Sequence, residues 1–188
     1  MRMNKKSIII FCMAALMCSC AAEFNNVYKS PDNDYKYEFA KQCFAEGKFQ
    51  QAISLLQDVV TFRKGTDTAE ESLYLLALSQ YCNHDFEAAS ATFKKYYATY
   101  PRGVFAEQAA FNVGQSLYES TPEPRLDQTP TVGAINAYQQ FLDVFPDSKL
   151  RGEAQQRLFD LQDNLVKKEY LSAELYYNLG GYFGNINA

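Results

Sequence analysis

Two neighbouring side chains, Cys82 and His84, are the residues of this 188-residue chain best suited to covalent catalysis. A cysteine becomes a nucleophile when a base such as histidine lies within hydrogen-bonding reach. Residues two positions apart on a helix point to different faces, so this spacing is poor for a dyad. His84 also stands beside Asp85, in sequence typical of a turn between helices. We therefore favour a solvated turn histidine over a Cys–His nucleophile.

The other polar motifs have structural explanations. The sequence contains no HExxH, no Walker phosphate loop, no dinucleotide fingerprint and no paired CxxC. The acidic residues Glu70 and Glu71 lie at an expected helix start, where negative charge complements the helix dipole. We expect no enzyme activity, no metal site and no cofactor.

The N-terminus has the pattern of a secretory signal peptide. Basic residues precede an apolar run at 8–17, which is too short for a transmembrane helix of roughly 20 residues. Ser19 before Cys20 resembles a bacterial lipobox, although Met17 and Cys18 depart from the commoner residues. We expect cleavage after residue 19, a diacylglycerol on Cys20 and a polar tether over 20–32. An ordinary cleaved signal or another anchor is the alternative.

The charge of the mature chain argues against some partners. Without the three basic residues of the signal, 15 basic and 22 acidic residues remain, a net charge near −7. This surface predicts no nucleic-acid binding and leaves membrane attachment to the acyl chains. Cys43 and Cys82 are then the remaining unmodified thiols. They could pair, but we favour small buried hydrophobes.

Three series of residues recur at intervals of 37. They put two aromatic rings and a small residue on one face of successive helices, and such a period is typical of stacked helix hairpins. We predict an all-α fold, a tetratricopeptide-repeat solenoid of antiparallel helix hairpins. A similar triple recurs as Tyr170, Ala173 and Tyr177. The three series are Tyr37, Tyr74 and Phe111; Ala40, Ala77 and Gly114; and Phe44, Tyr81 and Tyr118.

The repeats divide residues 33–188 into units at about 33–66, 70–103, 107–148 and 150–188. The small residues of the second series, with Ala173, should face Ala52, Ala89 and Ala134 and let the helices of each hairpin approach closely. A long helix is expected over 150–179, followed by a turn at Gly180 and Gly181. The last hairpin is incomplete, which indicates either a fragment or a face covered by a partner; we favour the fragment.

Six aromatic residues are candidates for a peptide-binding groove: Tyr37, Phe44, Tyr74, Tyr81, Phe111 and Tyr118. Packing between repeats explains most of them. Tyrosine nevertheless recurs where leucine would pack equally well, so we expect about half of the rings to open toward an extended peptide.

An insertion at residues 119–130 distinguishes the third unit. Its three prolines exclude a helix, and Glu123, Arg125 and Asp127 give it polar recognition groups. This loop could contact a partner or act as a passive linker, and the sequence supports both interpretations equally.

Several segments resemble one family. These are AEESLYLLA at 69–77, YYATYPRG at 96–103, FPDS at 145–148, TPEPRLDQT at 121–129 and LQDNLVKKEYLSAELYY at 161–177. With the lipobox and short tether, the chain from Cys20 onward looks like the BamD family, the tetratricopeptide lipoproteins of the outer-membrane β-barrel assembly machinery.

The resemblance implies a lipid-anchored protein of the outer membrane that faces the periplasm. It implies partnership with BamA and other assembly subunits, and contact of the N-terminal units with unfolded outer-membrane proteins. Five repeats are usual, so the chain would stop about one and a half units early, and no BamA-contact residues can be transferred. Two alternatives stay open: a tetratricopeptide lipoprotein scaffold for cell-wall synthesis or envelope transport, and an envelope enzyme using Cys82 and His84.

Overall fold

The described part of the chain is entirely helical. The computed structural model describes residues 23–62 and 68–186, with side chains through residue 179. Within those residues, a short helical segment at 23–29 precedes seven longer helices and there is no strand. The signal peptide and Cys20 lie outside the described residues. The longer helices are α2 (Asn33–Ala45), α3 (Phe49–Phe62), α4 (Ala69–Cys82), α5 (Phe86–Thr99), α6 (Ala106–Glu119), α7 (Thr129–Val144) and α8 (Arg151–Ile186).

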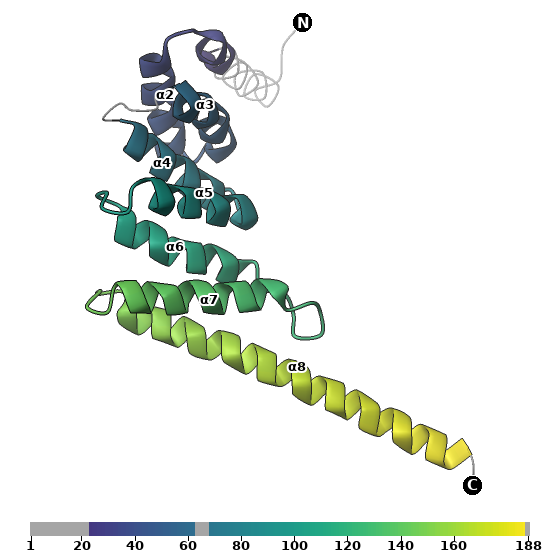
Figure 1. Ribbon diagram of the computed structural model, residues 1–188. Coiled ribbons are helices and arrows are strands. Elements are labelled where there is room, and N and C mark those ends of the chain that lie inside the picture. Colours follow the sequence, from purple (N-terminus) through teal and green to yellow (C-terminus); the bar gives the residue numbers. More distant parts are fainter. Residues whose placement is uncertain (1–22, 63–67, 187–188) are drawn as a thin grey trace, which may run out of the picture. The chain divides into compact units, whose positions relative to one another are not determined.

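The chain forms two compact units, and the boundary falls within α4, after Ser79. In the first unit α2 and α3 form an antiparallel hairpin (Figure 1). The Asp32 carboxylate begins α2 by accepting hydrogen bonds from the amides of Asp34 and Tyr35, at 2.9 and 3.1 Å. Ala40 and Ala52 are fully buried, as the repeat predicted, and they lie in a core that includes Leu76 of α4.

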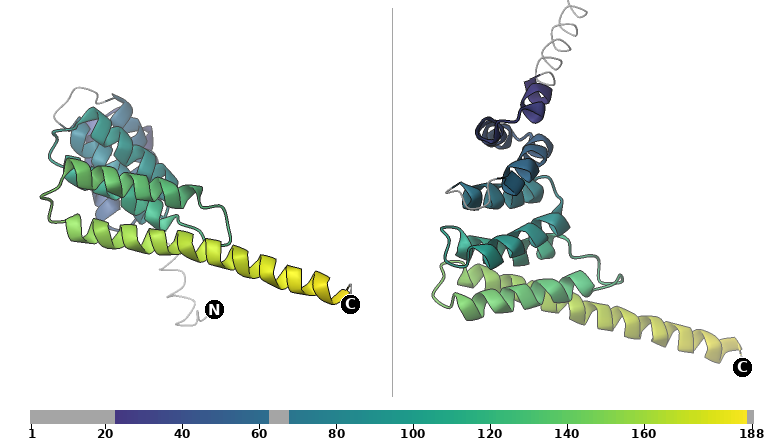
Figure 2. Two further views of the ribbon diagram at one scale, coloured as in Figure 1. Left: turned by 60° about the horizontal axis from the view of Figure 1, so that its bottom comes forward. Right: turned by 45° about the horizontal axis from the view of Figure 1, so that its top comes forward.

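In the second unit, α5, α6, α7 and α8 pack in chain order, each against the next (Figures 1 and 2). Its core has Phe111 packed edge-to-face on Tyr138 and on Phe141, with ring centroids 5.6 and 5.4 Å apart. Gly114 of α6 lies directly against the Tyr138 ring of α7. Helices α6 and α7 therefore approach closely at Gly114, but the residue that Gly114 meets is Tyr138 and not the small Ala134 that the sequence predicted. Packing of the helices in series confirms the all-α hairpin fold.

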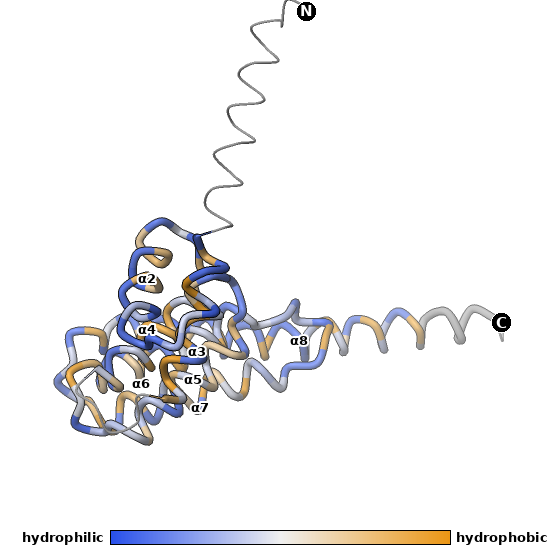
Figure 3. Tube along the Cα trace, turned by 90° about the horizontal axis from the view of Figure 1, so that it is seen from above, coloured by the Kyte–Doolittle hydropathy of each residue, from blue (hydrophilic) through white to orange (hydrophobic). Residues whose placement is uncertain are grey.

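Helix α8 differs from the expectation at its C-terminal end. The prediction of a turn at Gly180 and Gly181 is wrong, because α8 continues without interruption to Ile186. Each helical glycine costs only about 1 kcal/mol relative to alanine, and no proline removes a backbone donor there. In the part of α8 that extends beyond its contact with α7, Tyr170 and Tyr177 are 65% and 81% exposed, and Ala173 is exposed too. Ala173 thus does not face a second helix in the described residues, and Figure 3 shows hydrophobic positions recurring along this part of α8.

The turns of the first two hairpins have the same backbone geometry. Gly47 and His84 are 37 residues apart, and both adopt positive φ angles, 73° and 61°. In each turn, the amide of this residue donates to the carbonyl three residues back at 3.0 Å. The next amide donates to the carbonyl five residues back, at 2.8 Å in one turn and 2.9 Å in the other. The repeat therefore requires a left-handed residue here, which favours glycine.

Replacing His84 by glycine is expected to stabilise the protein by about 0.5–1 kcal/mol. A non-glycine residue in the left-handed region costs about 1–2 kcal/mol, and part of the gain is lost with the edge-to-face contact between the His84 and Phe86 rings. Urea unfolding measures the change. The matched control is Gly47→Ala, which should destabilise by about 1 kcal/mol although a Cβ there meets nothing within 4 Å. A loss of stability in His84→Gly would contradict this account of the turn.

Candidate functional site

The six candidate groove residues fall into two sets by burial. Tyr37, Tyr74 and Phe111 are buried. Burial raises the pKa of the Tyr37 hydroxyl well above its usual range, and the negative charge of Glu71 nearby adds to the shift. These three rings therefore pack inside their units and do not offer a free face to a peptide.

Phe44, Tyr81 and Tyr118 are half-buried. Phe44 meets Phe49 at 5.6 Å, and Tyr81 meets Phe86 at 5.4 Å, both edge-to-face at 63°. Each pair closes the turn of its hairpin. The Tyr118 ring instead contacts α8, where the Arg157 guanidinium lies 4.6 Å from its centroid. These three rings are therefore only partly accessible to a ligand.

The third-unit loop is held by hydrogen bonds. Gln128 is buried at its base, and its Nε2 donates to the carbonyls of Glu123 and Leu126, at 2.9 and 3.2 Å. Its Oε1 accepts from Thr131 Oγ1 at 2.6 Å and from Asn164 Nδ2 of α8 at 3.0 Å. The loop is thus fixed to α8 rather than free.

The loop displays its tip to solvent. Glu123, Arg125 and Asp127 are exposed, and Leu126 between them is 57% exposed. Lys168 of α8 supports the tip by donating from Nζ to the Leu126 carbonyl at 3.1 Å. The loop thus holds an exposed apolar residue between charged residues of both signs.

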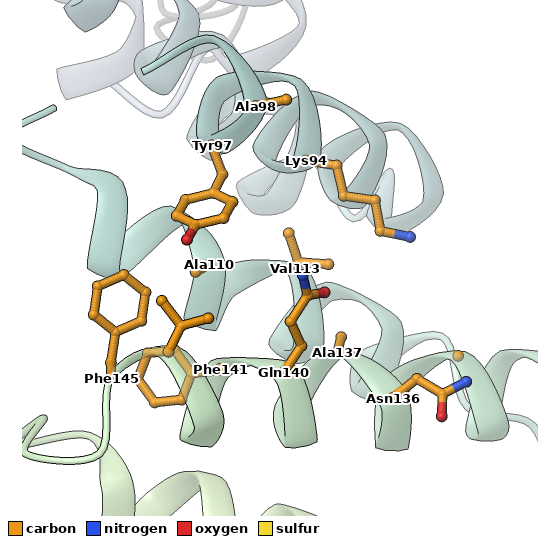
Figure 4. A pocket seen from close by; sticks show the side chains of 12 residues that line it. Lys94, Tyr97, Ala98, Ala110, Val113, Asn136, Ala137, Gln140, Phe141 and Phe145 are labelled. Atoms are coloured by element: carbon orange, nitrogen blue, oxygen red, sulfur yellow. The ribbon is translucent and has the colours of Figure 1, made fainter. Parts of the chain in front are cut away.

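A groove that the sequence analysis missed lies between α5, α6 and α7. It has a volume of about 420 Å³, within the usual range of about 300–1,000 Å³ for ligand pockets. Tyr97, Phe141 and Phe145 form its aromatic end, while Lys94 and Asn136 lie toward the other end (Figure 4). Small and amide residues of α7 line it at helical spacing, which is also the spacing of a solvated helix face and so gave no distinctive signal. These residues are Gly133, Asn136, Ala137 and Gln140.

Among the described residues, no hydrogen bond joins the Cys82 thiol to the His84 ring. The His84 ring packs on Phe86 at 5.6 Å, and burial raises the pKa of the Cys82 thiol. A raised pKa leaves less thiolate at neutral pH and lowers nucleophilicity. Cys43 is buried, and both cysteines are free thiols. The geometry thus offers little support for the envelope-enzyme alternative.

These features define a class of protein: a helical-hairpin repeat with an ordered loop and a groove. The chain belongs to the YfiO family, described as an outer membrane lipoprotein, which matches residues 30–187. It is also similar to the outer membrane protein assembly factor BamD of Caulobacter vibrioides, with 18% identity over 171 residues. That match covers 89% of this chain and 56% of the relative, so the chain spans about half of the relative's length. Among the described residues, no helix is long and apolar enough to span a membrane.

Proposed function

We propose that this protein is a lipid-anchored scaffold of the β-barrel assembly machinery. In this role it binds BamA and segments of unfolded outer-membrane proteins and promotes their folding and insertion. The observation that carries the proposal is the family match over residues 30–187. The printed name of the Caulobacter relative, an outer membrane protein assembly factor, supports the same function.

We further propose that Cys20 carries the acyl chains and holds the helical body at the periplasmic face of the outer membrane. Two or three acyl chains attach a protein far more durably than one, because each buried methylene contributes about 0.8 kcal/mol. The candidate partner contacts are the loop residues Glu123, Arg125 and Asp127, whose exposed position suits an interface.

Depletion followed by quantitative proteomics of the outer membrane tests the function. If the proposal is right, many barrel proteins fall together, and wild-type protein restores them while Cys20→Ala does not. Unchanged barrels with a defect in cell-wall synthesis or transport would overturn it and favour the alternative scaffold. A photo-cross-linker at Arg125 tests the partner separately: BamA should be recovered from intact envelopes, and capture of a different protein would contradict the assignment of this loop.

A further inference from the structure

The groove between α5, α6 and α7 combines an aromatic end with polar groups that have no partner. Tyr97 lies against Phe145, with ring centroids 6.2 Å apart, and Phe141 lies 5.5 Å from the same ring. Ala110 and Val113 of α6 contribute short side chains to the lining. Phe141 is almost fully buried, so an apolar side chain at this end would contact the half-buried rings of Tyr97, from α5, and Phe145, at the end of α7 (Figure 4).

The polar groups of the groove are unused by the described part of the protein. Lys94, Asn136 and Gln140 are exposed, and none of their side chains has a hydrogen bond or ion pair with another described residue. Among the residues that the structure describes, no acidic side chain lines the groove. Lys94 is therefore its one charged lining group, and a ligand with a carboxylate would complement it.

The spacing of the two amides fits an extended polypeptide. Asn136 and Gln140 lie one turn apart on the same face of α7, a separation of about 6 Å along the helix. Alternate residues of an extended chain repeat every 6–7 Å or so, so each amide could bond the main chain of alternate residues. In Figure 4, Lys94 lies across the groove from these amides, away from its aromatic end.

We propose that this groove binds an internal, extended polypeptide segment with a bulky apolar side chain and, two residues away, a side-chain carboxylate. The bulky apolar side chain of the ligand enters the aromatic end of the groove, and its carboxylate pairs with Lys94. The side-chain amides of Asn136 and Gln140 bind the main chain of the ligand. Residues two apart in an extended chain point to the same side, so both can enter together. The inference rests on the proposed function only in taking other polypeptides as the ligands.

Fluorescence anisotropy with the purified full chain in detergent tests the proposal. The probe is a labelled, end-blocked peptide, Gly-Asp-Ser-Phe-Ser-Asp-Gly, which presents a carboxylate on both sides of the ring and so fits either chain direction. Replacing its Phe by Ser should weaken binding at least tenfold. Replacing both Asp by Asn should weaken it about threefold to fivefold at physiological salt.

The protein variants have matched controls on the same helices. Lys94→Gln should weaken binding about threefold to fivefold and remove the difference between the Asp and Asn peptides, whereas Lys95→Gln should change neither. Gln140→Ala should weaken binding and Gln139→Ala should not. Lys95 and Gln139 are exposed neighbours outside the groove. These surface changes leave folding intact, which circular dichroism verifies.

Several outcomes would overturn the proposal. They are no saturable binding, equal binding of the Asp and Asn peptides by the wild-type protein, or equal effects of Lys94→Gln and Lys95→Gln. Self-association that is lost in Gln140→Ala but not in Gln139→Ala would replace the peptide by a second copy of the chain. The proposed function is judged by barrel levels after depletion, so either conclusion can fail while the other stands.

Discussion

Replacing Gly114 by valine is expected to destabilise the protein by about 3 kcal/mol. A Cβ built on Gly114 lies 2.9 Å from two ring carbons of Tyr138, closer than atoms of this kind approach. The Tyr138 ring cannot move aside easily, because it is fully buried and its hydroxyl donates to Gln115 Oε1 at 2.8 Å. Overpacking of this kind typically costs about 1–3 kcal/mol, and the branched side chain of valine places the change at the upper end.

The matched control is Gly152→Val. Gly152 lies in the first turn of α8, and a Cβ added there would meet no other atom within 4 Å. Because valine has a better helix propensity than glycine, this variant should match or slightly exceed the wild-type stability. Thermal and urea unfolding of both variants measure the difference. Equal stabilities would show that α6 and α7 can separate to admit a side chain, against the close approach described above.

The helical hairpins could be predicted because their signal is local and repeated. Small residues at 37-residue intervals mark core positions: Ala40 and Ala77 are fully buried, and so are Ala52 and Ala89. The turn at His84 could also be predicted, but its left-handed backbone, which it shares with Gly47, could not be predicted from a histidine. Patterns of this kind persist in a sequence because each unit repeats the same packing problem.

The site was harder to predict. The groove joins residues of three helices, and its polar members, Lys94, Asn136 and Gln140, have the spacing of any solvated helix face. The aromatic periodicity, by contrast, drew attention to Tyr37, Tyr74 and Phe111, which are buried. Periodicity reports which residues face a neighbouring helix, but it does not report where the neighbours leave a space between them.

The fixed conformation of the third-unit loop also depends on a hydrogen bond to a residue distant in sequence. Its prolines predicted the absence of a helix correctly for residues 121–128, although Pro130 falls in the first turn of α7, where its missing amide is tolerated. Nothing in the loop's composition showed that Asn164, 36 residues beyond Gln128, would hold it. For that reason the sequence supported equally the two interpretations of this loop, a contact with a partner and a passive linker.

Replacing Gln128 by alanine is expected to release this loop and to destabilise the protein by about 2–3 kcal/mol. The substitution removes all four hydrogen bonds of the amide and leaves the fully buried Thr131 hydroxyl without its acceptor. An unsatisfied buried polar group costs about 1–3 kcal/mol. Gln128 is the N-cap of α7, but its side chain makes no capping hydrogen bond, so the start of the helix should survive.

Two measurements separate loop release from general unfolding. Trypsin should cleave after Arg125 at least about tenfold faster in Gln128→Ala under native conditions, because an opening of the loop then requires less free energy. Hydrogen exchange should accelerate at residues 121–127 while the middle of α7 stays protected. Gln139→Ala is the control, since this glutamine is exposed and lies well inside α7, away from its first turn. Unchanged cleavage at Arg125 would mean that Lys168 and the prolines hold the loop without Gln128, and that the buried amide is not what makes it rigid.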